Sequence, residues 1–336
     1  MFITSTTMAN RAPTTIVDVA TILPVEIMLA ETFSTRDLYC NFISTIDDTI
    51  RFLATRRLLS NSKECDNCHI AMSLTRRASI SDGKQWTCKE CRKNVSIRAG
   101  SFFQNSKLKL TQILDIVYGW AREHPQNEAA RDAKLGEGST HTIVDWYNFC
   151  RDITEQHLVD NPTQVGGFDE NTLLSKTVEI DESKFFHPKY HRGQWREGHW
   201  VFGGIERGSG NCFLVEVPDR TENTLTPIIE RYVLPGTIII SDGWRAYRNI
   251  NQIGGGIYEH EVITHEENFV NPDDPTIHTQ NVENMWMRAK RKLKRQCGTS
   301  EALFTSYLHE FIWRNKFKSR DIFSALLVCV REQYPV

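Results

Sequence analysis

The sequence has no apolar run that approaches the roughly 18 residues of a membrane-spanning helix. Glu26 interrupts the most apolar stretch of the first thirty residues, which is not typical of a secretory signal peptide. Without a secretion signal, nine cysteines do not indicate a disulfide framework. No heptad repeat predicts a coiled coil. We therefore expect a soluble, intracellular protein with no membrane partner.

The chain also has little net charge, −2 over 336 residues, so its composition alone indicates no nucleic-acid partner. The charge is unevenly distributed, however. Residues 51–110 contain 13 Lys or Arg and 4 Asp or Glu, a balance of +9, and residues 280–296 contain 6 and 1, a balance of +5. The rest of the chain therefore carries −16. A solvated charged face explains one basic segment, whereas two segments beside recognisable motifs favour nucleic acid.

The length predicts at least two domains. Residues 1–33 show no sustained periodicity and are expected to form a leader, either loose or partly ordered. Apolar positions then recur at helical spacing over 34–59, where Ser34 or Thr35 can cap the start of a helix. This helix and the motif that follows it make up a predicted domain over 34–106.

Four of the cysteines form two close pairs in that domain. Cys65 and Cys68 precede Cys88 and Cys91 by nineteen residues, and the segment Gln85-Trp86-Thr87 between the pairs has the composition of a strand. Two such pairs place four thiolates for tetrahedral zinc. Four protein ligands leave no open position for water, so we predict a structural zinc ribbon; unrelated buried thiols are the alternative.

A helical segment is predicted over 107–160. An amphipathic helix over 107–123 ends at His124-Pro125, and a short helix over 127–135 and a Gly-containing turn precede a second helix over 139–153. This is helix-turn-helix spacing, although a packing hairpin has the same pattern. DNA reading by the second helix would use residues of its first turns, for which the candidates are Thr140, His141 and Thr142.

The pattern changes to strands beyond a Pro- and Gly-containing linker. Short runs rich in Val, Ile and Phe occupy 177–185, 200–206, 212–217 and 237–241, and a helix is expected over 224–233. These elements predict an α/β fold with a mixed sheet over 170–320. The last residues, 321–336, are expected to form a C-terminal helix.

Three acidic residues fall at positions that suit a catalytic site. Asp181 lies within the first strand, Asp242 follows the apolar strand that ends at Ser241, and Glu283 lies on the flank of a basic helix. Clustered carboxylates select Mg²⁺ or Mn²⁺, and a pair of such ions cleaves phosphodiester bonds. Each acid could instead be a cap or a surface charge. Glu182 competes with Asp181, because strand alternation lets only one of the two face the site.

Five ordered blocks resemble the Merlin-type eukaryotic DNA transposases and their bacterial insertion-sequence relatives over residues 36–318. They begin at Val178, His199, Ser241, His278 and Tyr307, and the third and fourth read SDGWRAY and HTQNVE. The resemblance implies an RNase H-like catalytic domain in which Asp181, Asp242 and Glu283 form a DDE triad. It places His278 or Asn281 beside the third acid, and it implies a nuclear location.

The same resemblance implies excision at the terminal repeats of an element and joining of its 3′ ends to target DNA. Lys290 and Lys294, on the helix of Glu283, would guide the DNA backbone. Joining two ends requires a homodimer or a larger synaptic complex. Two alternatives remain open from the sequence: a domesticated DNA-binding regulator that no longer cuts, and an RNase H-like nuclease that cuts without strand transfer.

Overall fold

The computed structural model describes residues 14–136, 138–186, 198–263, 278–295 and 301–336, and it divides the chain into two compact units. The first unit comprises residues 1–153 and 319–336, and the second comprises 154–318. Part of the predicted leader, residues 1–13, lies outside the described residues. None of the described helices is both long enough and apolar enough to cross a bilayer.

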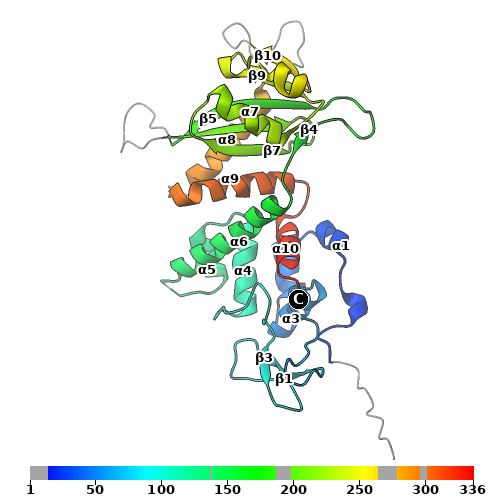
Figure 1. Ribbon diagram of the computed structural model, residues 1–336. Coiled ribbons are helices and arrows are strands. Elements are labelled where there is room, and N and C mark those ends of the chain that lie inside the picture. Colours follow the sequence, from blue (N-terminus) through cyan, green and yellow to red (C-terminus); the bar gives the residue numbers. More distant parts are fainter. Residues whose placement is uncertain (1–13, 137, 187–197, 264–277, 296–300) are drawn as a thin grey trace, which may run out of the picture. The chain divides into compact units, whose positions relative to one another are not determined.

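The first unit is built from short helices and a small antiparallel sheet (Figure 1). Its helical elements are η1 (Val19–Thr21), α1 (Val25–Ala30), α2 (Thr35–Asp37), η2 (Leu38–Phe42), α3 (Ile46–Thr55), α4 (Leu110–Ala121), α5 (Gln126–Asp132), most of α6 (Thr140–Asp160) and α10 (Ile322–Gln333). Its sheet has the order β1 (Ser73–Arg76), β2 (Lys84–Thr87) and β3 (Asn94–Ser96). The C-terminal helix α10 packs against α1 and α4, so segments far apart in the sequence share one core.

The prediction of one continuous helix over 34–59 is wrong. Ser34 caps α2 as expected, by accepting a hydrogen bond from the Asp37 backbone N–H. A second cap then interrupts the helix, because the Thr45 hydroxyl accepts from the Asp48 N–H and donates to the Asp48 carboxylate. A capped start forces the preceding residue out of helical geometry, so α3 begins anew at Ile46.

The second unit is a three-layer α/β fold around a mixed sheet of order β10-β9-β5-β6-β7. Its strands are β5 (Thr177–Phe185), β6 (His199–Glu206), β7 (Cys212–Val217), β9 (Ile238–Asp242) and β10 (Glu259–Ile263), and β4 (Val165–Gly166) pairs separately with β8 (Val233–Leu234). β5, β6 and β7 are antiparallel, whereas β9 and β10 run parallel to β5. This is the RNase H-like arrangement, so the predicted fold class is confirmed; β10 is a strand that the sequence analysis missed.

Helices cover both faces of this sheet (Figure 1). One face packs against α7 (Glu222–Tyr232) and the 3-10 helices η4 (Arg245–Tyr247) and η5 (Ile250–Gly255), around Phe202 and Phe213. The other packs against α8 (Gln280–Arg295) and α9 (Glu301–Lys316), around Val201 and Leu214. The buried stripe predicted for the Glu283 helix is the stripe that α8 buries: Val282, Met285, Trp286, Ala289 and Leu293.

Candidate active site

The alternation of side chains along β5 separates the two competing acids. Asp181 lies on the face that α8 covers and accepts a hydrogen bond of 3.0 Å from the Trp286 indole N–H. Glu182 lies on the opposite face, beside Tyr247 of η4. The structure therefore brings Asp181, and not Glu182, to the helix that carries Glu283.

The strand register brings Asp242 to the same place. Glu179 of β5 is the partner of Ile240 in the parallel strand β9, and this is the last pair of that ladder. Asp181 and Asp242 each lie two residues farther along, so both side chains project from the face that α8 covers. Asp242 is the last residue of β9 and accepts a hydrogen bond of 3.0 Å from the Trp244 backbone N–H.

Helix α8 runs along β5, and successive turns of the helix contact successive residues on one face of the strand. Val282 donates its backbone N–H to Glu179, Trp286 donates to Asp181, and the Lys290 ammonium donates to Ser183 at 2.5 Å. Four helical residues advance about 6 Å and two strand residues advance about 6.6 Å. The two periods nearly coincide, so each turn of α8 meets the next inward-facing residue of β5.

Glu179 anchors the start of this helix. Its side chain is fully buried, and one carboxylate oxygen accepts the backbone N–H groups of Asn281 at 2.8 Å and Val282 at 2.9 Å. The other oxygen accepts from the Asn281 side chain at 2.6 Å and from Arg207 at 2.7 Å. A carboxylate at a helix N-terminus satisfies N–H groups that have no partner within the helix. Glu179 thereby fixes the position of Glu283, one residue after Val282.

His278 and Asn281 take part in the hydrogen bonds that hold the start of α8 to Glu179 and Arg207. The Arg207 guanidinium, held by Glu179, donates to the His278 carbonyl at 2.7 Å, and the Asn281 side chain donates to Glu179. The family resemblance placed one of them beside Glu283. The hydrogen bonds of both residues orient the helix that presents Glu283. Glu179 and Arg207 were not identified from the sequence; a charged residue two positions before Asp181 on the same strand face was the available signal.

The three acids are electrostatically coupled. Burial, together with the charges of Asp242 and Glu283, raises the pKa of Asp181 to about 6, although the backbone N–H of Glu182 and the Trp286 indole act to lower it. Like charges brought together favour protonation unless a cation lies between them. The three carboxylates do not belong to the ligand groups lying within 4.8 Å among the described residues.

Glu182 is also perturbed, on the other face. Burial, together with the charges of Asp181 and Asp242, raises its pKa to about 7, although Tyr247 and Arg220 act to lower it. It therefore lies close enough to the two aspartates to sense their charge.

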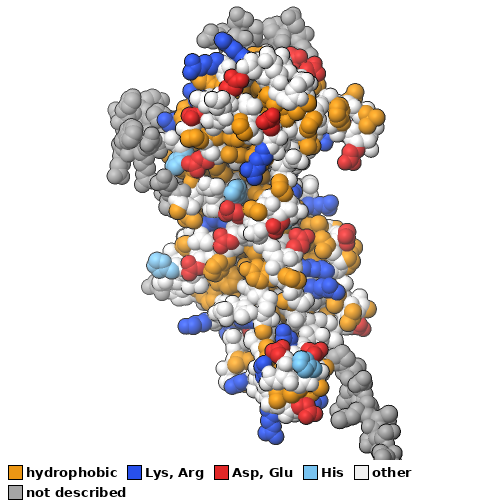
Figure 2. All heavy atoms as spheres, in the orientation of Figure 1, with side chains coloured by type: hydrophobic (Ala, Val, Ile, Leu, Met, Phe, Trp, Pro, Cys, Tyr) orange, Lys and Arg blue, Asp and Glu red, His pale blue; other side chains and the backbone are white. Residues whose placement is uncertain are grey.

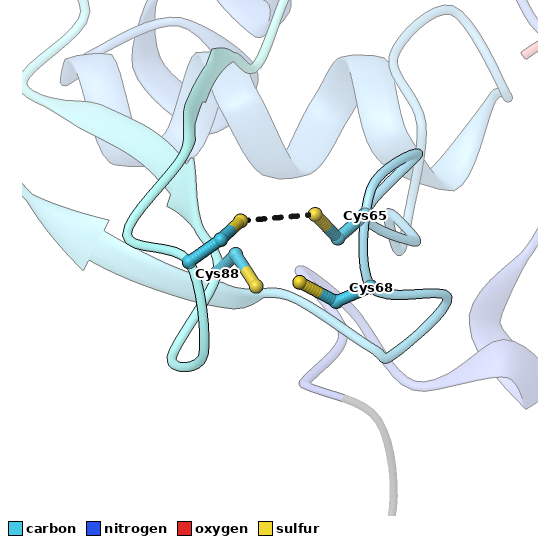
Figure 3. A group of neighbouring side chains, drawn as sticks. Cys65, Cys68 and Cys88 are labelled. Atoms are coloured by element: carbon cyan, nitrogen blue, oxygen red, sulfur yellow. Dashed lines mark hydrogen bonds between the residues drawn. The ribbon is translucent and has the colours of Figure 1, made fainter.

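Cys65, Cys68 and Cys88 of the first unit point toward one another (Figure 3), and Cys91 completes the group. Their sulfur atoms all lie within 4.8 Å of one another, and the Sγ atoms of Cys65 and Cys91 are 3.6 Å apart. Backbone N–H groups of Asn67 and Cys68 lower the pKa of the Cys65 thiol to about 7, which favours the thiolate that binds metal. The predicted strand at Gln85 to Thr87 is β2. The donor set fits a tetrahedral metal ion.

The candidate DNA contacts lie at the surface. Thr140 and His141 are exposed in the first turn of α6, and Thr142 is half-buried. Lys294 is exposed on α8, whereas Lys290 is also exposed but is engaged by Ser183. On the face drawn in Figure 2, Lys and Arg side chains are spread among Asp and Glu rather than gathered in one patch.

Comparison with known proteins gives the site its context. Residues 173–316 match the family model of the ISXO2-like transposase domain. The second unit is similar to a transposase domain. The match spans β5 to α9, the segment that carries Asp181, Asp242 and Glu283.

Two relatives and one solved structure extend the comparison. An uncharacterized protein in transposable element ISH50 of Halobacterium salinarum is 23% identical over 266 residues, 76% of this chain and 86% of the relative. An uncharacterized transposase-like protein of Haemophilus influenzae is 29% identical over 116 residues, 34% of this chain and 88% of the relative. The catalytic core domain of BIV integrase is similar with a TM-score of 0.27 and 17% identity, over 39% of this chain and 80% of that one. The sequence matches support a transposase-type role.

Proposed function

We propose that the chain is a DNA transposase that cleaves phosphodiester bonds at element ends and transfers the 3′ ends to target DNA. The observation that carries this proposal is the convergence of Asp181 and Asp242, from adjacent parallel strands, with Glu283, from a helix anchored on the same strand. That convergence lies within the segment that matches a transposase domain.

The three carboxylates would hold two Mg²⁺ or Mn²⁺ ions. Bound there, the ions would activate the attacking water or 3′ hydroxyl and stabilise the leaving oxygen. The ions would favour the ionised form of Asp181, whose pKa burial and neighbouring acids raise in the protein alone. Trp286 would orient its carboxylate, and Glu179, through α8, would hold Glu283 in reach.

Supercoiled plasmid provides a test that needs no knowledge of the terminal repeat. We expect the purified protein to nick it with Mg²⁺ or Mn²⁺, and the Asp242→Asn variant to lose this activity by at least a hundredfold. Glu230→Gln is the matched control, because it removes an exposed carboxylate from α7 of the same unit. Equal nicking by Asp242→Asn and wild type would refute the metal site.

Strand transfer separates a transposase from the two alternatives. A 3′-hydroxyl oligonucleotide that carries an element end should become joined to plasmid when wild-type protein is added. Nicking without joined product would indicate a nuclease. Retention of biological activity by Asp181→Ala, together with its loss in Cys88→Ala, would indicate a DNA-binding regulator.

The four-cysteine cluster supports a structural Zn²⁺ site in the same proposal. Its four ligands come from two loops that the small sheet β1–β3 joins, so metal binding would fix that sheet. The first turn of α6, with Thr140, His141 and Thr142, would contact DNA together with Lys290 and Lys294 of α8.

Two further properties follow from joining two ends in one event and from the eukaryotic Merlin-type resemblance. The first is a homodimer or larger synaptic complex, which light scattering of the protein mixed with end DNA would measure. The second is nuclear location, which imaging of a fluorescent fusion would test. A monomer with both ends bound, or a fusion excluded from nuclei, would contradict the respective proposal.

A further inference from the structure

Arg220 lies between the faces of two tryptophans near the site. Its guanidinium carbon is 4.0 Å from the centre of the Trp200 ring and 4.5 Å from that of Trp244. The Trp244 indole N–H also donates to the Arg220 carbonyl at 3.3 Å. Arg220 follows β7, Trp200 belongs to β6 and Trp244 follows β9, so three separate segments meet at one cation.

This arrangement adjoins the candidate site on the sheet face opposite to α8. Trp200 is the cross-strand partner of Lys184, which lies two residues beyond Glu182 on the same face of β5. Trp244 lies two residues after Asp242 and donates its backbone N–H to that carboxylate. The Arg220 guanidinium, stacked on Trp200, therefore lies over the sheet face from which Glu182 projects.

The donors of Arg220 are not used within the described part of the chain. Stacking occupies the two flat faces of a guanidinium and leaves its N–H groups pointing outward in the plane. No described residue forms a hydrogen bond or ion pair with these groups, and Arg220 is half-exposed. Lys184 supplies a second cation, with Nζ 5.5 Å from the centre of the Trp200 ring.

We propose that the Trp200–Arg220–Trp244 clamp binds a phosphodiester of the DNA strand that enters the active site, with Arg220 as its bidentate donor. The inference rests on the proposed function and adds a substrate-binding residue to it. A planar guanidinium forms two parallel hydrogen bonds with phosphate oxygens, and two indoles that already restrict it lower the entropic cost of binding. Lys184 then supports the neighbouring backbone as a point charge.

A cation is needed at this position. Asp181, Asp242 and Glu182 place three carboxyl groups at the end of the sheet, and their ionised forms repel a polyanionic strand. Metal ions held by the proposed site would offset this charge on the α8 side. Arg220 offsets it on the other side of the sheet, beside Trp244, which lies two residues after Asp242, and so gives the strand a second attachment.

The salt dependence of DNA binding tests the clamp. The test would use the fluorescence anisotropy of a forked DNA of arbitrary sequence with single-stranded arms. It would be followed over a range of NaCl concentrations without added divalent metal. Each phosphate contact contributes about 0.7 to 0.9 to the slope of log affinity against log salt. Arg220→Gln should lower the slope by about one contact and weaken binding by about tenfold. Arg220→Lys should keep the slope and still weaken binding, since the planar fork is lost.

Arg231→Gln is the matched control, because Arg231 also lies over one aromatic ring, that of Tyr232, at 5.4 Å, but belongs to the last turn of α7. It should bind DNA as wild type does. An unchanged slope in Arg220→Gln, wild-type affinity in Arg220→Lys, or an equal loss in Arg231→Gln would each overturn the clamp. Failure of wild type to nick plasmid would refute the transposase proposal separately, since the binding assay involves no cleavage.

Discussion

The carboxylate of Glu179 accepts the backbone N–H of Val282 at 2.9 Å, across 103 residues of sequence. This bond and its neighbours tie the first turn of α8 to the central strand that also carries Asp181. The helix cannot shift along the strand without leaving the Glu179 charge buried and unpaired. The positions of Asp181 and Glu283 relative to each other therefore depend on a residue outside the acidic triad.

Replacing Glu179 by alanine should destabilise the second unit by roughly 3 to 5 kcal/mol, because it leaves the Arg207 guanidinium and two helical N–H groups without their acceptor. Urea unfolding followed by tryptophan fluorescence measures the change. The exposed Glu230 serves as the control, and its alanine variant should differ from wild type by about 0.5 kcal/mol or less. Equal unfolding free energies for the two variants would show that Glu179 anchors nothing.

The Trp286 ring packs against Gly203 where its indole N–H donates to Asp181. Gly203 is the cross-strand partner of Asp181, and a Cβ atom there would lie 2.7 Å from the Trp286 ring and 2.9 Å from the Phe213 carbonyl oxygen. Backbone cannot yield as a flexible side chain does, so Gly203→Ala should displace the indole and cost about 1 to 3 kcal/mol. The NMR resonance of the Trp286 indole N–H should shift in this variant.

Gly136→Ala provides the comparison for Gly203→Ala, because a Cβ atom at Gly136 meets nothing within 4 Å. That variant should leave both the melting temperature and the Trp286 resonance unchanged. A Gly203→Ala protein with wild-type nicking and an unshifted resonance would show that the indole does not require the open position.

Much of the second unit follows from its sequence. The strands at 177–185 and 212–217 have the predicted bounds, and the buried stripe of α8 was read from helical periodicity. The sequence could not predict which of Asp181 and Glu182 faces the site. The two acids are adjacent, and helices cover both faces of β5, so neither face is marked by exposed polar residues. The hydrogen bonds by which Glu179 anchors α8 were also not predicted, because their donors lie about a hundred residues away and sequence periodicity reports only local order.

The raised pKa of Asp115 leads us to expect that the stability of the first unit depends on pH. Burial raises the pKa of Asp115 to about 6, with a smaller increase from the charge of Asp132, against an ordinary value of about 4. The protonated form is favoured in the folded protein. Its contribution to stability is therefore complete below about pH 4 and is lost as the pH rises through about 6. Asp115→Asn should remove this loss and stabilise the unit by about 2 to 3 kcal/mol at pH 8 relative to pH 4.

Urea unfolding at pH 4 and pH 8 measures this difference. Asp145→Asn is the control, because it removes an exposed carboxylate from α6 and should show no such pH dependence. A gain of stability that is equal at both pH values would assign the effect to packing rather than to ionisation.

Removal of zinc should unfold the sheet β1–β3 while leaving the sheet of the second unit intact. The small sheet has three short strands, and its one fully buried large side chain is Trp86, so the four thiolates supply much of its stability when metal is bound. Metal analysis should find one zinc per chain, lost in Cys88→Ser and retained in Cys40→Ser, which changes an exposed cysteine outside the cluster. Hydrogen exchange should then show loss of protection at Gln85 to Thr87 in Cys88→Ser and unchanged protection in β5. Full protection of β2 without metal would show that the ribbon folds by packing alone.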